Sequence, residues 1–315
     1  MRIASIDIGT NTCKLSVADY DIVDGLNFIY KDKKIIALIN PEFQGGEISQ
    51  NTIENLVDVL KNYKQIVESF NVDKLITTAT SAVRSSNNKC KIIERIKEAT
   101  DIHVEIIDGK TEAEYVYVGV TNAVDIGNKP VLVVDIGGGS VEFIICDEET
   151  IFSSFSFDIG ATRLLYDNDF SDPFTNKDLV KLNSILNETL HDLLMLCKSF
   201  KIKTLIGSSG SFEVFLNLIN EGKSVDKKYK NRNNSVINIE KFETIYQKLI
   251  SYTYQQRCEM LGMDLTRVKI IPFAAFITQF LTKNIGLKKI IQSKYSIKEG
   301  LIFNYINKNF KTDEK

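Results

Sequence analysis

Two segments of this chain end an apolar run with an aspartate and continue into a turn of small residues. The first is RIASIDIGTNT, residues 2–12, which contains Asp7, and the second is VLVVDIGGGS, residues 131–140, which contains Asp135. Each is followed by a second strand-like stretch, a turn and a third one. The order strand, loop, strand, turn, strand therefore occurs twice, which indicates a duplicated unit.

Helical and extended patterns fill the sequence between and after the two repeats. Residues 50–70 carry apolar side chains at helical spacing after Ser49, which is a suitable N-cap. A single long amphipathic helix is expected over residues 176–200. Further strands are expected over these ranges: 74–80, 103–108, 203–207 and 289–293. Strands that alternate with helices are typical of an α/β fold, here with mixed sheets.

Length and pattern together predict two domains. We expect the first over residues 1–125 and the second over residues 126–299, each containing one copy of the repeat. A C-terminal helix over about residues 300–315 is expected to pack back onto the first domain.

Composition excludes several classes of function. The net charge of −2 argues against a broad nucleic-acid surface, and no apolar run is long enough for a membrane span. The five cysteines are scattered without a CxxC pair, as in a reduced cytoplasmic protein. With two histidines in the chain, a histidine triad or a zinc site is not expected.

The small-residue turns point to phosphate chemistry. Glycine-rich turns that leave a strand expose backbone N–H groups to phosphate oxygens, and a neighbouring acid suits Mg²⁺. A third small-residue loop follows the strand at 203–207. The alternative is a tight hairpin in which the glycines serve the turn alone. The candidate phosphate-binding residues are Gly9, Thr10, Asn11, Thr12, Gly137, Gly138, Gly139, Ser140, Gly207, Ser208, Ser209, Gly210 and Ser211.

These motifs resemble the exopolyphosphatase / guanosine pentaphosphate phosphohydrolase (Ppx/GppA) family of the actin and sugar-kinase superfamily. The resemblance spans nearly the whole chain and runs through DIGTN, ATSAVR, IDGKTEAEYVYVGV, DIGGGSVE, DIGATRL, GSSGS and SKYSIKEG. It implies two ribonuclease-H-like (actin-like ATPase) domains with mixed sheets and an active site in the cleft between them.

The resemblance also implies individual roles. Glu112 matches the family's general base, Arg84 an arginine that faces the phosphate chain, and Glu142 an acid near the metal, beside Asp135 and Asp7. Phosphoanhydride hydrolysis needs such a carboxylate, together with cations and N–H groups that meet the phosphoryl charge. The alternatives are that Glu112 is only a first-turn acid that interacts favourably with the helix dipole, that Arg84 forms a surface ion pair and that Glu142 faces solvent.

The sequence departs from the family pattern beside the base. Thr111 stands where the family has a second acid, and Glu114 where it usually has an arginine. Because the acid at residue 112 is retained, the resemblance still implies catalysis, whereas the preferred substrate length is left open.

The function predicted is a Mg²⁺-dependent exopolyphosphatase that removes the terminal phosphate of inorganic polyphosphate. Mn²⁺ is an alternative metal and K⁺ a further candidate ion. The same residues suit guanosine pentaphosphate, and a kinase or a non-catalytic polyphosphate or alarmone binder are further alternatives. A homodimer is expected, and neither nucleic acid nor membrane is an expected partner.

Overall fold

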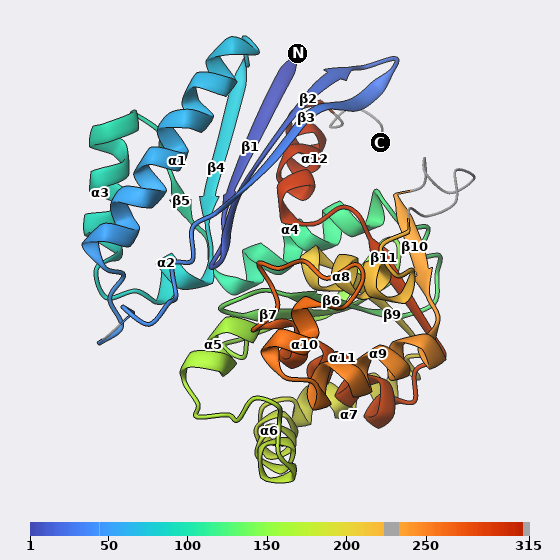
Figure 1. The fold of residues 1–315 in the computed structure, drawn as a ribbon. Coiled ribbons are helices and arrows are strands. Elements are labelled where there is room, and N and C mark those ends of the chain that lie inside the picture. Colours follow the sequence, from blue (N-terminus) through green and yellow to red (C-terminus); the bar gives the residue numbers. More distant parts are fainter. Residues whose placement is uncertain (44, 224–232, 311–315) are drawn as a thin grey trace. The chain divides into compact units, whose positions relative to one another are not determined.

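The computed structural model describes residues 1–43, 45–223 and 233–310. The chain forms two compact units, one of Met1–Gly119 with Ser296–Lys315 and one of Val120–Tyr295 (Figure 1). The domain limits expected from the sequence, residues 1–125 and 126–299, stay a prediction.

The first unit is built on a five-stranded mixed sheet with the order β3-β2-β1-β4-β5. Strands β1, β2 and β3 form an antiparallel meander, and β4 and β5 continue the sheet in parallel to β1. The strands are β1 (Arg2–Ile8), β2 (Thr12–Asp21), β3 (Gly25–Ile35), β4 (Lys74–Ala79) and β5 (Glu105–Ile106). The strand expected over residues 103–108 is thus confined to two residues.

Helices cover both faces of this sheet. The helices of the first unit are α1 (Gln50–Ser69), α2 (Ser81–Ser85), α3 (Lys89–Thr100) and α12 (Ile297–Phe310), together with α4 (Gly109–Thr121), which runs past the end of the unit at Gly119. Helix α1 begins where the sequence predicts, because the Ser49 side chain accepts a hydrogen bond from the Thr52 amide. Its apolar stripe and that of α3 pack with Ile6, Leu15 and their neighbours in one buried cluster.

The opposite face of the first sheet holds α12. Ile302 and Ile306 of this helix form a small core with Ile3 of β1 and Ala18 of β2. The described residues end at Phe310, and the C-terminal helix expected over about residues 300–315 stays a prediction. Residues 311–315 of that expected helix lie outside them.

The second unit repeats the same strand order. Its six-stranded sheet runs β10-β11-β9-β6-β7-β8, so β8-β7-β6-β9-β11 follows the plan of the first sheet, with β10 added at the edge. The strands are β6 (Val131–Ile136), β7 (Val141–Cys146), β8 (Ile151–Phe157), β9 (Thr204–Ser208), β10 (Asn234–Ile237) and β11 (Lys289–Ser293). The duplicated strand order predicted from the two aspartate-containing turns is therefore present.

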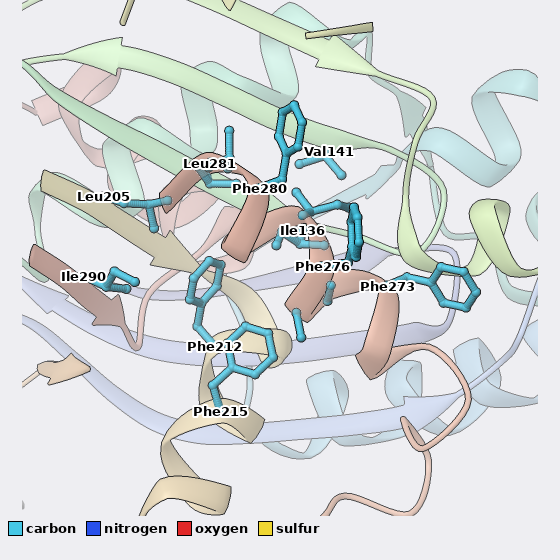
Figure 2. Close-up of a cluster of buried hydrophobic side chains, with 14 of the residues drawn as sticks. Ile136, Val141, Leu205, Phe212, Phe215, Phe273, Phe276, Phe280, Leu281 and Ile290 are labelled. Carbon is cyan, nitrogen blue, oxygen red and sulfur yellow. The ribbon is translucent and has the colours of Figure 1, made fainter. Parts of the chain in front are cut away.

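An aromatic-rich core lies on one face of the second sheet. Figure 2 shows phenylalanines of α8 and α11, among them Phe212 and Phe276, packed beside sheet residues such as Ile136 and Leu205. The helices of this unit are α5 (Ala161–Tyr166), α6 (Asn176–Thr189), α7 (His191–Ser199), α8 (Ser209–Ile219), α9 (Ile239–Ser251), α10 (Tyr254–Cys258) and α11 (Ile271–Ile285).

Two expectations about the second unit were wrong in detail, and one strand was missed. The single helix expected over residues 176–200 is divided at Leu190, whose side chain is fully buried, so the chain turns there and both helices face the core. The loop expected at 207–211 is a direct junction between β9 and α8. Strand β10 was not predicted. No described helix is long and apolar enough to cross a membrane.

Candidate active site

The hairpin after Asp7 is closed by its own backbone. The Gly9 amide donates to the Thr12 carbonyl at 3.1 Å, which turns β1 directly into β2. The Thr10 carbonyl accepts the Leu38 amide at 2.7 Å, so the segment after β3 supports the loop. The glycine is suited to the turn because a Cβ at Gly9 would lie only 3.2 Å from the Thr12 carbonyl oxygen.

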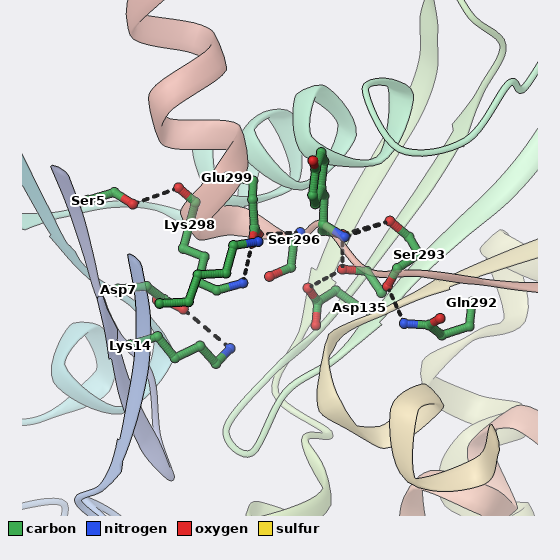
Figure 3. A network of polar contacts seen from close by, with 12 residues as sticks. Ser5, Asp7, Lys14, Asp135, Gln292, Ser293, Ser296, Lys298 and Glu299 are labelled. Atoms are coloured by element: carbon green, nitrogen blue, oxygen red, sulfur yellow. Dashed lines mark hydrogen bonds and ion pairs between the residues drawn. The ribbon is translucent and has the colours of Figure 1, made fainter. Parts of the chain in front are cut away.

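Asp7 lies in a row of polar side chains across the first sheet. It is 3% exposed and is opposite Lys14 on β2 and Thr78 on β4. The Lys14 ammonium is 3.5 Å from a carboxylate oxygen of Asp7 (Figure 3). Asp7, one of the predicted metal ligands, therefore faces a cation in its own sheet.

Two hydroxyl groups near this row have no hydrogen-bond partner within residues 1–43, 45–223 and 233–310. They belong to Thr78 at the end of β4 and to Ser81 at the start of α2, and both are buried. A buried hydroxyl without a partner costs free energy, so such groups are expected to meet water or ligand. The carboxyl end of β4 therefore has two hydroxyl groups that can still form hydrogen bonds with water or ligand.

Arg84 and Glu112 form an ion pair in the first unit. A guanidinium nitrogen of Arg84 donates to Glu112 Oε2 at 2.8 Å and also to the Ile107 carbonyl at 3.0 Å. Glu112 is 8% exposed and lies in the first turn of α4, which Asp108 begins by accepting the Thr111 amide at 2.7 Å. The structure thus brings together two residues that the sequence analysis assigned to the same reaction.

A second ionic cluster fixes the start of α12. Glu299 is fully buried and accepts from Lys298 at 2.5 Å, Lys31 at 2.8 Å and the Ser296 amide at 3.0 Å (Figure 3). Ser5 of β1 donates to the Lys298 carbonyl at 2.7 Å. These contacts tie the helix to the strand that carries Asp7.

Burial and charge act in opposite directions on Glu299. Burial would raise the pKa of its carboxyl group, but the ammonium groups of Lys298 and Lys31 outweigh this and hold the pKa below its ordinary value. Burial lowers the pKa of Lys298, and the carboxylate of Glu299 opposes that effect. The pair is therefore charged because its members compensate each other.

The second hairpin has the same closure and a more open backbone. The Gly137 amide donates to the Ser140 carbonyl at 3.1 Å, as Gly9 does to Thr12. The carbonyls of Gly137 and Gly138 accept amides from the start of α5, which holds the loop from behind. For the amides of Gly138 and Gly139, the described part of the chain contains no acceptor. These N–H groups can bind an anion.

The acids of the second unit lie side by side. Asp135 on β6 is directly opposite Glu142 on β7, and both are buried, at 7% and 2% exposure. Ser208 donates to Asp135 at 3.0 Å, while Ser140 and Ser156 donate to Glu142 at 2.6 and 2.8 Å. The reading of Glu142 as a solvent-facing strand residue is thus wrong.

This acid pair fits a hard divalent cation. Like charges directly opposite on a sheet repel, and hydroxyl donors offset only part of that repulsion. Mg²⁺ is commonly held by one or two carboxylates together with waters and substrate phosphates, so two carboxylates suffice. Among the described residues, no group of three or more acids, histidines or cysteines could hold a metal ion by itself.

The β9–α8 junction brings a further residue to the second unit's site. Ser209 and Ser211 donate to the Ile136 carbonyl at 3.2 and 3.4 Å, and Ser209 has a φ of 73°. A Cβ at Gly210 would lie 2.4 Å from the Arg267 guanidinium, so a larger residue there would require the arginine side chain to move. Burial lowers the pKa of Arg267, and Asp264, Glu213 and Asp135 oppose that effect.

The structure groups the predicted residues within each unit. In the first unit, Asp7 shares a sheet row with Lys14, and Arg84 binds Glu112. In the second unit, Asp135, Glu142 and the small-residue turns lie at the same end of the sheet, where β6 and β9 end and β7 begins. Sequence reasoning did not single out Lys14 or Arg267. The position of residue 14 opposite Asp7 follows from hairpin register, whereas nothing local marks residue 267.

Comparisons with known proteins identify the family. Residues 17–309 match the Ppx/GppA phosphatase family. Exopolyphosphatase 2 of Mycobacterium tuberculosis is 25% identical over 317 residues, covering 95% of this chain and 97% of that protein. A bifunctional 3-dehydroquinate synthase/phosphatase of Fusobacterium nucleatum is 32% identical over 201 residues, and the matched region is 30% of that longer protein.

A solved structure extends the likeness over the whole fold. The crystal structure of an exopolyphosphatase from Cytophaga hutchinsonii matches with a TM-score of 0.92 and 31% sequence identity, covering 98% of each chain. The chain belongs to the Ppx/GppA phosphatase family.

Proposed function

We propose that this protein is an exopolyphosphatase that hydrolyses the terminal phosphoanhydride bond of inorganic polyphosphate. Family membership supports the reaction class, and the likeness to two exopolyphosphatases over almost the whole chain supports the substrate. The observation that carries the proposal is the unshared amides of Gly138 and Gly139 next to a buried pair of acids. This combination suits a phosphate group that arrives with a divalent cation.

In the proposed mechanism, the hairpin of each unit offers its own groups to phosphate. In the second unit, the amides of Gly138 and Gly139 bind phosphate oxygens. In the first unit, residues 9–12 and Lys14 are the groups that can meet phosphate charge. Asp135 and Glu142 would hold Mg²⁺, which supplies positive charge to the phosphoryl oxygens when bound. Asp7 was predicted as a further ligand, and its ion pair with Lys14 favours a role in orienting that lysine instead.

Glu112 is proposed to take the proton of the attacking water. In the structure its carboxylate is bound to Arg84 at 2.8 Å. An incoming phosphate would compete for that guanidinium, because a phosphate oxygen is also a strong partner for arginine. Transfer of Arg84 to the substrate would remove the Arg84 bond from the Glu112 carboxylate, and we propose that this makes the carboxylate a better acceptor for the proton of the attacking water.

The test is orthophosphate release by the wild type, Glu112→Gln and Glu114→Gln. Glu114 is an exposed acid two residues further along the same helix, and it provides a control for the change of charge. Loss of a general base is expected to lower the rate from polyphosphate by roughly 10²- to 10⁴-fold, whereas Glu114→Gln should stay close to the wild type. An unchanged rate in Glu112→Gln would contradict the proposed base.

The choice of substrate decides among the remaining alternatives. Long-chain polyphosphate, guanosine pentaphosphate and ATP are offered in parallel, with and without Mg²⁺. Release from guanosine pentaphosphate alone would move the assignment to the other activity that the family name contains. Binding of polyphosphate without release from any substrate would make the protein a sensor rather than an enzyme.

We further propose a cytoplasmic location and, as the sequence analysis expected, a homodimer. The five cysteines are free thiols in the structure. Burial raises the pKa of Cys146 and of Cys197 to about 12, so neither is a ready nucleophile. Thiols of this kind suit a reducing compartment. The same assay of orthophosphate release can test whether Mn²⁺ replaces Mg²⁺ and whether K⁺ is required.

A further inference from the structure

A cavity in the Val120–Tyr295 unit lies away from the acid pair. It has a volume of about 470 Å³ and is lined at the amino ends of β6, β9 and β11. Val131 lines it, whereas Asp135 lies at the other end of the same strand. At the rise of an extended strand, these two residues are about 13 Å apart. The cavity is therefore separate from the proposed phosphate site.

Four lysines from three segments converge on this cavity. They are Lys129 before β6, Lys201 and Lys203 between α7 and β9, and Lys289 at the start of β11. All four are exposed, and none forms an ion pair with a carboxylate of residues 1–43, 45–223 or 233–310. Because four ammonium groups lie together here without an ion-pair partner among the described residues, they create a local positive field.

The remaining lining is partly apolar and contains one acid. Ile126, Pro130 and Phe200 contribute half-buried apolar surface, and the Phe200 ring is stacked on Phe152 with centroids 5.1 Å apart. Asp125 is the acid in the lining, and its carboxylate can accept a hydrogen bond from a hydroxyl or amino group. A bare phosphate would use the lysines and would make no contact with this apolar surface or with Asp125.

Volume agrees with the composition of the lining. Cavities that bind small organic molecules are typically about 300–1,000 Å³, with apolar walls and a few polar groups that fix orientation. This cavity lies in that range. A ligand that satisfies all of its parts carries a strongly negative end, an apolar or planar body and a hydroxyl or amino group.

We propose that this cavity is a binding site for a nucleoside diphosphate or a similar organic diphosphate, distinct from the site of hydrolysis. The phosphates lie among the four lysines, the base lies against Pro130 and Phe200, and the sugar hydroxyls donate to Asp125. The proposal is independent of which phosphate chain the enzyme hydrolyses. It assigns a ligand to a basic cavity that the proposed reaction does not use.

The probe is the α,β-methylene analogue of ADP, because its P–C–P bridge cannot be hydrolysed. Binding is measured by titration calorimetry in EDTA, so that a metal-dependent site does not contribute. The cavity variant is Lys201→Ala/Lys289→Ala. The control is Lys198→Ala/Lys288→Ala, which removes the same charge from exposed neighbours that do not line the cavity. Methylene diphosphonate serves as the probe without a nucleoside.

The expected result has two parts. The cavity variant should bind the ADP analogue at least about tenfold more weakly than the wild type and the control, because two ammonium contacts to phosphate are lost. The wild type should bind methylene diphosphonate more weakly than the ADP analogue. Equal affinity of all three proteins for the ADP analogue would overturn the site, as would no binding to the wild type. Equal affinity for the two probes would overturn the nucleoside part.

Discussion

The acid pair on the second sheet leads to a prediction about metal binding. Asp135 faces Glu142, whereas the corresponding Asp7 on the first sheet faces Lys14. We predict that Mg²⁺ raises the thermal stability of the wild type and of Asp7→Asn but not that of Asp135→Asn. The two variants carry the same chemical change at equivalent positions of the two hairpins, so each serves as the control for the other.

The magnitude follows from mass action and from the size of the unit. For a Kd of about 1 mM, roughly 10 mM Mg²⁺ stabilises the folded state by about 1.4 kcal/mol. In a unit of the size of Val120–Tyr295 this corresponds to a rise in Tm of roughly 3–5 °C. Without metal, Asp135→Asn relieves the repulsion with Glu142 but weakens the hydrogen bond from Ser208, so its Tm should stay near that of the wild type.

The assay is differential scanning calorimetry of the three proteins across a Mg²⁺ series, with Ca²⁺-free buffer and matched ionic strength. The reasoning is refuted if Asp135→Asn keeps the full rise in Tm. If Asp7→Asn loses the rise as well, Asp7 is also a metal ligand, as the sequence analysis predicted, and its pairing with Lys14 does not prevent coordination.

Two further predictions concern the framework of the sites. Replacing Glu299 with Gln leaves Lys298 buried without its carboxylate and should cost about 3 kcal/mol in unfolding free energy at pH 7. Folding lowers the pKa of Glu299, so the carboxylate's contribution to the free energy of unfolding is complete above about pH 4.3 and is lost at lower pH. A difference in unfolding free energy between the wild type and Glu299→Gln that stays constant down to pH 3 in denaturant melts would exclude this. Gly160→Ala places a Cβ 2.3 Å from the Gly138 carbonyl, whereas in Gly9→Ala the closest atom is at 3.2 Å. Gly160→Ala should therefore reduce phosphate release and stability more than Gly9→Ala. The reverse order in paired assays of the two variants would contradict this prediction.

The repeat and most of the strands were predictable because they depend on local patterns. An apolar run that ends in an acid and a small-residue turn predicts a strand and a hairpin, and both sheets contain them. The division of the helix at Leu190 was not predictable from periodicity, since the apolar spacing continues across the break. Only the position of the core decides that this residue must turn inward.

The pairing of the two acids in the candidate site was predictable from the sequence, whereas the approach of the distant arginine was not. Asp135 and Glu142 are seven residues apart in the chain, and their opposition follows from a hairpin that closes between Gly137 and Ser140. Arg267 lies far along the chain from both, and it reaches Gly210 through tertiary packing alone. A single sequence contains no local signal for such a contact.

The two hairpins show how one backbone plan can support different chemistry. Gly9 and Gly137 close equivalent turns, and Asp7 and Asp135 occupy equivalent strand positions. The cross-strand neighbour then differs, since it is Lys14 in one sheet and Glu142 in the other. An aspartate beside a lysine is already neutralised, whereas an aspartate beside a glutamate gains most from an added cation. Since the repeated backbone offers both copies the same geometry, we propose that the residue opposite the aspartate determines which copy attracts metal and which presents positive charge to phosphate.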